Sequence, residues 1–537
     1  MLWIALHLPR LSLDIIERAH NHTPSHTQPP GLTDKPLAIC NHLQVLSVNQ
    51  QALNAGVSPG SRRASAQALV PEIELIAYDP TREQQALATL ACWVLQFTPS
   101  VGFAPAPLPE KKTLPRANPA GATPPLPEPG QAGLLLEVAA SLKLFGGLKN
   151  LLTELNQGLQ DLGYYAHLGI ASTCHGAWLL AQNQAGRNQT TCEAVELAEN
   201  PDLLAQRLAP LPVTLLTHAI KHQNALRAIG AHTLGDLIEL PRAGIAHRFG
   251  KKLLLEVDAA LGGQPQPVAY YQAPEQFAAK LELMADVDRT EPLLYAARKL
   301  ILELTGWLTA RQSGVRSFDL LLQHNTPPQT SLSVRLTNAS RDPERLTGLL
   351  RERLNVLQLR TSVHTLHLQC ARIQSLVPAS QSLFDSKAST HESLGRLLEH
   401  LQNRLGREQV QRLYLAQDHR PEAAYQIKVI DKLEDLGRID TANAAPSSPD
   451  ELFCTSTGSL PRPLWLLRNP SPLSERNNRP WLNSTLSVLA GPERIETGWW
   501  DTRLIQRDYF VAEDDTNTLY WIFRERRRGW FVHGRFG

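Results

Sequence analysis

The chain has 537 residues, with 53 Lys and Arg against 51 Asp and Glu and a formal net charge of +2. This length is too great for one hydrophobic core, so several domains are expected. The small positive charge is compatible with nucleic-acid contact but does not argue for it by itself. Six cysteines are scattered without a C-x-x-C pair, which disfavours a disulfide framework and a zinc site and fits a reducing cytoplasm.

The N-terminal segment 1–20 has a short apolar run, with no basic stretch before it and no small-residue cleavage site after it. A signal peptide is therefore not predicted. Nowhere do 18 apolar residues follow one another, which excludes a membrane-spanning helix on sequence grounds. The sequence predicts a cytoplasmic protein that makes no membrane contact.

The first part of the chain alternates short apolar strands with helices. Leu2 to Leu8 is predicted as a buried strand, followed by a helix from Leu13 to Ala19. Segments 35–40 and 45–48 are predicted as a small hairpin, and a helix is predicted over 50–55. Residues 104–131 are Pro-rich without apolar periodicity, which indicates a solvated loop.

The segment Gly133 to Gly147 is predicted as a buried strand followed by the turn into a long amphipathic helix. Leucines recur at helical spacing behind it, at positions 144, 148, 151, 155, 159 and 162. A further strand is predicted over 168–172. These elements together predict an α+β unit built on a mostly buried sheet.

The stretch from Leu281 to Pro378 is predicted in the order strand (281–287), helix (291–311), strand (314–324), strand (330–337), helix (342–356) and strand (363–373). Asp342 is a suitable N-cap, with Pro343 at the first helical position. The segment is therefore predicted as a β-α-β-β-α-β domain.

The C-terminal part is predicted as an amphipathic helix over 392–407, a strand over 410–415, a Pro/Ser-rich connector over 440–480 and a small β meander over 484–537. Aromatic residues crowd the last forty positions, beside Arg524 and three further arginines at 526–528. Such density indicates a compact core, a protein-docking face or a stacking surface for single-stranded DNA.

Two short runs resemble a known family. Leu136-Glu137-Val138 and the segment Ser141–Gly146 match the end of the central palm strand of Y-family (translesion) DNA polymerases. The opening segment 2–11, Asp418–Glu422, Arg462–Leu466 and the segments 498–501 and 530–534 are similar to a polymerase-like branch of bacterial mutagenesis cassettes. That resemblance covers nearly the whole chain.

The resemblance implies an α+β multidomain fold with a Y-family-like palm, fingers and thumb, a β-α-β-β-α-β little finger, and a C-terminal extension ending in a small β module. The implied domains are a palm (1–9 and 79–182, with the Pro-rich insertion 104–131), fingers (10–78), a helix-hairpin-helix-like thumb (183–264), a little finger (281–378), a linker with a clamp-binding-like peptide (379–390), a helix and strand segment with the connector (391–480) and an aromatic β module (484–537).

The carboxylates that hold two Mg²⁺ ions in active relatives are missing here. Their positions fall on His7, Ala132 and Gly133, and the Tyr and Arg that contact the triphosphate fall on Gln50 and Leu53. Two-metal catalysis needs hard oxygen ligands, so the resemblance implies a non-catalytic protein without metal or other cofactor. The alternative is an active DNA-directed DNA polymerase with an atypical metal site.

Other implied sites concern binding. The thumb's second half is similar to segment 226–237, but the hairpin glycines fall on residues 217–219, which puts phosphate capture in doubt. Arg316 and Arg335 are candidates for DNA phosphate contacts, with solvated arginines as the alternative. The candidate sliding-clamp peptide is Gln381, Leu383 and Phe384, and the candidate docking tryptophans are Trp499, Trp500, Trp521 and Trp530.

The partners implied by the resemblance are DNA, the sliding clamp (beta subunit), a small RecA-like companion protein and an error-prone replicative-type DNA polymerase. The implied function is an adaptor in damage-induced mutagenesis and translesion synthesis. The rival interpretations are the active translesion polymerase and a plain DNA-binding module. The carboxylate count of the palm separates the first two, and the linker peptide and aromatic tail disfavour the third.

Overall fold

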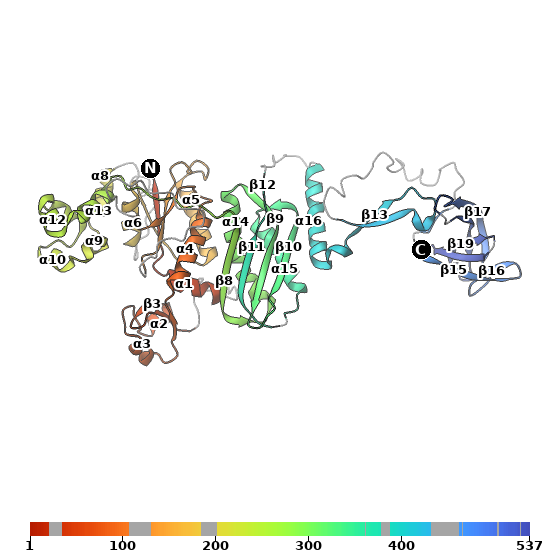
Figure 1. The fold of residues 1–537 in the computed structure, drawn as a ribbon, viewed down its shortest axis with the longest axis horizontal. Coiled ribbons are helices and arrows are strands. Elements are labelled where there is room, and N and C mark those ends of the chain that lie inside the picture. The colour runs from red at the N-terminus through yellow and green to blue at the C-terminus, as the bar shows by residue number, and fades with distance from the viewer. Residues whose placement is uncertain are drawn as a thin grey trace. The chain divides into compact units, whose positions relative to one another are not determined.

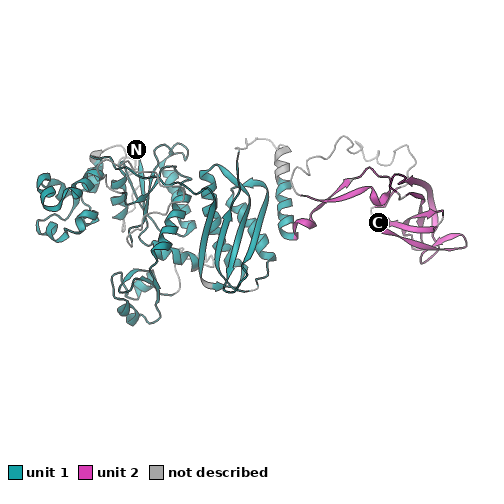
Figure 2. Cartoon of the chain, viewed as in Figure 1, with its two compact units in different colours: residues 1–404 teal, residues 405–537 magenta. Residues whose placement is uncertain are grey.

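The computed structural model describes residues 1–20, 35–106, 130–183, 201–359, 361–376, 387–430, 461–463, 465–501, 504–526 and 528–536. The chain forms two compact units, Met1–Arg404 and Leu405–Gly537, which Figure 2 colours separately. Every hydrophobic cluster of described residues lies within one of the two units.

The N-terminal sheet has four antiparallel strands in the order β5-β6-β1-β7. They are β1 (Trp3–His7), β5 (Val101–Ala104), β6 (Gly133–Glu137) and β7 (His167–Ala171), so the three strands predicted here are confirmed. All five residues of β1 are buried, because the sheet is covered on both faces.

Alternation along β1 divides the side chains between two layers. Leu2, Ile4 and Leu6 join a core with α4 (Pro80–Val94) and α5 (Leu148–Leu162). Trp3 and Ala5 join a second core with α6 (Cys174–Gln182). The sheet is therefore a middle layer, and α1 (Leu11–His20) follows its first strand (Figure 1).

A small sheet follows α1 in the chain. Its order is β3-β2-β4, from β2 (Leu37–Cys40), β3 (Val45–Val48) and β4 (Glu74–Ala77), with α2 (Gln50–Asn54) and α3 (Arg63–Leu69) between the strands. The predicted hairpin and helix are confirmed. The parallel strand β4 was not predicted, because none of its four residues is fully buried and apolar alternation is weak there.

A helical region covers the α6 side of the N-terminal sheet. It consists of α8 (Pro201–Leu208), the 3₁₀ turn η1 (Val213–Leu215), α9 (Thr217–Ile220), α10 (Gln223–Ala228), α11 (Leu234–Glu239), α12 (Arg242–Phe249) and α13 (Lys251–Leu261). Its apolar residues belong to the same cluster as Trp3 and Ala5. A capping box between Thr233 and Asp236 starts α11.

The central sheet is antiparallel, in the order β10-β9-β11-β8, with the short β12 (Ile373–Ser375) beside β9. Its elements are β8 (Phe277–Val287), α14 (Thr290–Ala310), β9 (Ser313–His324), β10 (Thr330–Ser340), α15 (Pro343–Val356) and β11 (Val363–Cys370). The predicted β-α-β-β-α-β order is confirmed. Asp342 accepts a hydrogen bond from the N–H of Glu344, as expected of an N-cap.

The central and N-terminal sheets share one hydrophobic core, which the sequence did not predict. Trp93 of α4 lies against Gly158 of α5 and Gly306 of α14, where an added Cβ atom would overlap with the indole at either glycine. Glu303 of α14 forms a buried ion pair with Arg18 at 2.5 Å, and Lys299 donates to the Arg18 carbonyl at 2.6 Å. These contacts join α14 to the N-terminal layer.

Helix α16 (Lys387–Leu405) packs against the edge strand β10 through polar groups (Figure 1). The buried Glu399 accepts hydrogen bonds from the Arg345 guanidinium at 2.7–3.1 Å and from the N–H of Thr337 at 2.6 Å. A covered edge cannot pair with another strand. The helix was predicted, and its attachment to this sheet was not.

The C-terminal unit contains an antiparallel ribbon and a six-stranded sheet. The ribbon is β13 (Gln411–Leu415) with β14 (Tyr425–Val429), flanked by the 3₁₀ turns η2 (Arg407–Gln409) and η3 (Pro421–Ala423). The sheet is a half-barrel in the order β16-β15-β20-β19-β18-β17. Its strands are β15 (Trp465–Arg476), β16 (Arg479–Trp481), β17 (Ser487–Thr497), β18 (Ile505–Glu513), β19 (Leu519–Glu525) and β20 (Gly529–Arg535).

The predicted start of the β module at residue 484 was wrong, because β15 and β16 precede it in the same sheet. Pro470 and Pro472 had placed this segment in the connector. Proline has no N–H to donate to a ladder, but β16 pairs only with Ser474–Arg476 of β15, so both prolines lie where β15 has a single neighbour.

Candidate functional site

The positions to which the resemblance assigns the metal ligands lie side by side in the N-terminal sheet. His7 is the register partner of Gly133 on β6 and of His167 on β7. Ala132 directly precedes β6 and is fully buried, and the His7 side chain is buried as well. The sequence prediction that His7, Ala132 and Gly133 form one site is consistent with this register, and no carboxylate is among them.

Trp178 of α6 occupies the space beside these residues. A Cβ atom at Gly133 would overlap with the Trp178 ring and would also meet the Leu6 carbonyl. The Trp178 ring stands edge-on to His7, with 5.2 Å between the centroids, and Trp178 itself is buried. An apolar ring therefore fills the volume that acidic side chains would need.

The His7 side chain is hydrogen-bonded within the protein and is not positioned to bind a metal ion. Its Nε2 lies 2.8 Å from the Gly130 carbonyl oxygen, so Nε2 carries the proton and donates. Burial lowers the pKa of His7, and the hydrogen bond to Gly130 offsets part of that effect. A neutral, hydrogen-bonded imidazole among apolar neighbours is a poor Mg²⁺ site.

Nearby acids do not replace the missing ligands. Glu137 is the register partner of Trp3, four residues along β1 from His7, which is roughly 13 Å at the usual rise per residue. Asp14 on α1 is buried and accepts a hydrogen bond from the N–H of Tyr165, and burial raises its pKa to about 8. Burial likewise raises the pKa of Glu17 to about 7. Burial therefore favours the protonated form of the Asp14 carboxyl, which binds Mg²⁺ less well than the carboxylate does.

The positions to which the resemblance assigns the triphosphate contacts lie on α2, beside the small sheet. Gln50 is exposed and donates to Asn54, and Leu53 is 48% exposed. Neither side chain can pair with phosphate oxygens as a cation does. A cavity of about 490 Å³ between α1, α4 and β8 includes Arg18 and Tyr271 in its lining, and none of the degenerate positions lines it.

In the helical region the hairpin N–H groups already have a partner. Thr217 and His218 donate their backbone N–H groups to the Glu256 carboxylate at 2.8 and 3.0 Å. Glu256 is buried, which alone would raise its pKa, but contacts with His175 and these donors lower it overall. An internal carboxylate therefore takes the place that the resemblance gives to a DNA phosphate.

The two candidate DNA-binding arginines are both exposed on the central sheet. Arg316 is on β9, and Arg335 on β10 is the register partner of Ser317. The two residues therefore occupy neighbouring positions on adjacent strands. The candidate clamp residues Gln381, Leu383 and Phe384 lie outside the described residues.

The four candidate docking tryptophans divide into two kinds. Trp499 and Trp500 are 80% and 52% exposed, and their rings meet edge to face at 5.5 Å. Trp521 is fully buried and Trp530 is 8% exposed, each in a core of the half-barrel. Trp521 and Trp530 are therefore structural, and a docking surface can include only Trp499 and Trp500 of this set.

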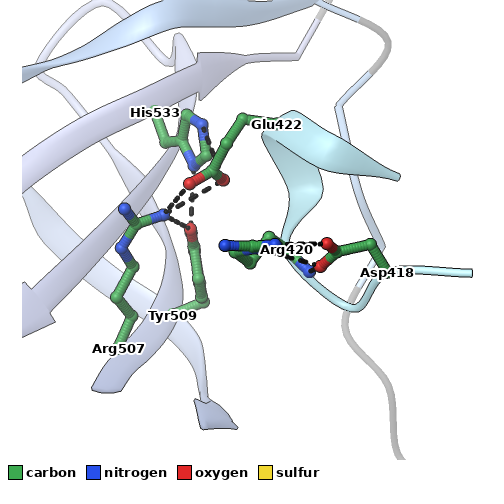
Figure 3. A network of polar contacts seen from close by, with 6 residues as sticks. All are labelled: Asp418, Arg420, Glu422, Arg507, Tyr509 and His533. Carbon is green, nitrogen blue, oxygen red and sulfur yellow. Dashed lines mark hydrogen bonds and ion pairs between the residues drawn. The ribbon is translucent and has the colours of Figure 1, made fainter. Parts of the chain in front are cut away.

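Sequence reasoning missed a polar network that joins the β13–β14 connection to the half-barrel (Figure 3). Glu422 accepts from Arg507 of β18 at 3.0 and 3.1 Å, and Arg507 also donates to the Tyr509 hydroxyl at 3.2 Å. The Tyr509 hydroxyl lies 2.8 Å from Nδ1 of the fully buried His533. The Asp418–Glu422 segment had been noted only for its resemblance, since its partners are some 85 residues away.

The impB/mucB/samB family model matches residues 22–107. Protein ImuB of Caulobacter vibrioides, from strains NA1000/CB15N and ATCC 19089/CIP 103742/CB 15, is 26% identical over 509 residues, covering 90% of this chain and 100% of the relative. The chain is a homologue of protein ImuB. Because residues 1–404 are about three quarters of the chain, the ImuB alignment extends into the C-terminal unit.

Among solved structures, a Dbh ternary complex is 16% identical with a TM-score of 0.35, covering 69% of this chain and 98% of its own. DinB from Sulfolobus solfataricus is 16% identical with a TM-score of 0.34, covering 69% and 98%. The kinship to ImuB therefore rests on the sequence alignment.

Two kinds of feature are absent from the part of the chain that the structure describes. There, no three His, Cys, Asp or Glu side chains are grouped so that they could hold a metal ion. In the same ranges, no helix has both the length and the apolar content that a membrane crossing requires.

His533 makes the C-terminal unit sensitive to acid. Burial lowers its pKa to about 4, so the unfolded state, with a pKa near 6.5, binds the proton more strongly. Stability is therefore complete above about pH 6.5 and declines as the pH falls toward 4, by about 3 kcal/mol at most. We expect the thermal midpoints of wild type and His533→Phe to differ in a pH-dependent way between pH 7 and pH 4. A constant difference would contradict this assignment.

Proposed function

We propose that this protein is a non-catalytic, Y-family polymerase-like adaptor of damage-induced mutagenesis that links DNA, the sliding clamp and an error-prone polymerase. The observation that carries the proposal is the filled metal site. His7, Ala132 and Gly133 stand where acids are needed, and Trp178 occupies the adjoining space. The homology to ImuB supports the mutagenesis setting.

Primer extension tests the absence of catalysis. We expect the purified protein to extend no primer with Mg²⁺ or Mn²⁺, because two-metal transfer needs paired carboxylates. The alternative, a DNA polymerase with an atypical metal site, predicts incorporation that disappears when one nearby acid is replaced. Asp14→Asn and Glu137→Gln are the informative variants, since these acids lie on α1 and β6 near the degenerate positions. Incorporation that survives both replacements indicates a contaminating polymerase.

DNA binding is proposed to use the exposed arginines of the central sheet. Each phosphate contact contributes roughly 0.9 to the slope of log affinity against log salt concentration. We therefore expect Arg316→Ala/Arg335→Ala to lower that slope by about 2 in a fluorescence titration with duplex DNA. Arg351→Ala is the matched control, because Arg351 is exposed on α15 of the same domain. An unchanged slope in the double variant would place the DNA elsewhere.

Clamp binding is proposed to use Gln381, Leu383 and Phe384. Burying a Leu and a Phe side chain contributes about 2 to 3 kcal/mol each. We expect Leu383→Ala/Phe384→Ala to weaken binding of the purified clamp by at least two to three decades in a surface-binding assay. Replacing Ser380 and Ser382 by Ala is the control within the same peptide. Wild-type affinity in the Leu–Phe variant would refute this contact.

The partner-docking surface is proposed to be the exposed pair Trp499 and Trp500. Exposed tryptophans on a fixed support are frequent anchors of protein interfaces, because one ring buries a large area with few rotatable bonds. The proposed occupants are the RecA-like companion protein and the error-prone polymerase.

A further inference from the structure

The connection between β13 and β14 is fixed to the half-barrel at two points. Glu422 is bound by Arg507, which is 12% exposed and bonded to the buried Tyr509. Arg420, two residues earlier, is itself buried. Figure 3 shows Glu422 pointing toward Arg507 and His533 of the half-barrel, and Arg420 bonded to the adjacent Asp418. The Glu422–Arg507 contact attaches the connection to the half-barrel. The contacts of Arg420 are therefore not needed for that attachment.

Arg420 joins two carboxylates that come from different segments. Its guanidinium binds Asp418 at 2.6–3.1 Å and Asp501 at 2.7 Å. Its carbon centre also lies 5.9 Å from the Trp500 ring centroid. A guanidinium can serve two carboxylates because its planar fork presents donors in several directions, which a lysine ammonium on a flexible stem does less well.

Asp501 directly follows Trp499 and Trp500 in the same turn. The turn follows Gly498, whose φ of +86° is the left-handed conformation that glycine adopts without strain. The Asp501 side chain is 36% exposed, and ion pairs with an exposed partner contribute little to stability. The Arg420–Asp501 link is therefore better placed to set the position of the turn than to stabilise the fold.

We propose that Arg420 is a positioning residue for the docking surface, holding the Trp499–Trp500 turn in its binding conformation through Asp501. The proposal rests on the function proposed above for this tryptophan pair. Its physical basis is preorganisation: a loop that is already ordered loses less conformational freedom when a partner binds. In this proposal the Asp418–Glu422 segment fixes the Trp499–Trp500 turn relative to the half-barrel.

Asp418 and Asp501 provide a matched pair of variants, because both bind the same guanidinium. Asp501→Asn removes the link to the turn and leaves the Asp418–Arg420 pair, whereas Asp418→Asn does the reverse. We expect Asp501→Asn to weaken binding of the purified companion protein and polymerase by about tenfold, and Asp418→Asn to change it less than twofold. Arg420→Lys should resemble Asp501→Asn. The near-UV circular dichroism of the tryptophan pair should change in Asp501→Asn and Arg420→Lys but not in Asp418→Asn.

Trp499→Ala/Trp500→Ala separates the two proposals. If that variant binds both partners as tightly as wild type, the docking surface is wrong. If it loses binding while Asp501→Asn keeps wild-type affinity and dichroism, the docking surface stands and the positioning role of Arg420 is overturned. Equal losses in Asp501→Asn and Asp418→Asn would also overturn it, since they would show that Arg420 acts by ordering its own connection.

Discussion

Trp93→Ala is expected to lower the free energy of unfolding of the N-terminal unit by about 3 to 5 kcal/mol. The indole is buried between α5 and α14, whose Gly158 and Gly306 leave room for it and for nothing larger. Removing it leaves a cavity that rigid helix backbones cannot fill. Urea unfolding followed by far-UV circular dichroism measures the loss.

Trp499→Ala is the control for this prediction. Trp499 is 80% exposed, so its removal should change stability by less than about 0.5 kcal/mol. A loss below about 1 kcal/mol for Trp93→Ala would mean that α14 does not pack closely on α4 and α5 in solution. The central sheet would then be free to move relative to the N-terminal sheet.

The packing of Trp93 between α5 and α14 could not be predicted from the sequence. Two of the three helices involved were predicted from the sequence: α5 from its leucine spacing, and α14 as part of the β-α-β-β-α-β order. Helix α4, which carries Trp93, was not predicted. The match of one tryptophan to two glycines separated from it by 65 and 213 positions has no local signal. Neither does the Arg18–Glu303 pair, which spans 285 positions.

At the candidate site, too, one feature could be predicted from the sequence and another could not. The resemblance assigned His7 and Gly133 to the same set of metal-ligand positions, and the β1–β6 register makes them partners. It could not show that Trp178 lies over Gly133, because Trp178 follows the last strand of the sheet and only the antiparallel order β6-β1-β7 brings its helix there.

The prediction that all four tryptophans belong to a docking surface failed for a different reason. Composition indicated both a core and a docking face, but it does not assign individual rings to either. Tyr509 and Trp521 stack at 4.0 Å inside the half-barrel, whereas Trp499 and Trp500 lie on a turn. Alternation could not have found the buried set either, because three successive residues of β19, Trp521–Phe523, are all buried.

Restoring an acid at the filled site is expected to be strongly destabilising. Gly133→Glu introduces a side chain where even a Cβ atom overlaps with Trp178 and meets the Leu6 carbonyl. Overpacking costs about 1 to 3 kcal/mol, and a buried carboxyl without a partner adds to it. We expect a loss of at least about 3 kcal/mol for Gly133→Glu and about 1 to 3 kcal/mol for Gly133→Ala, measured by urea unfolding.

Gly348→Ala is the matched control, since nothing lies within 4 Å of a Cβ atom there and the position is in helix α15. That substitution should stabilise the protein by roughly 0.5 to 1 kcal/mol. Trp178→Ala should recover part of the loss in the Gly133→Glu background, because it removes the ring that the new side chain meets. If Gly133→Glu alone unfolds at the wild-type urea concentration, Trp178 does not fill the site, and the argument that the metal-binding volume is closed fails with it.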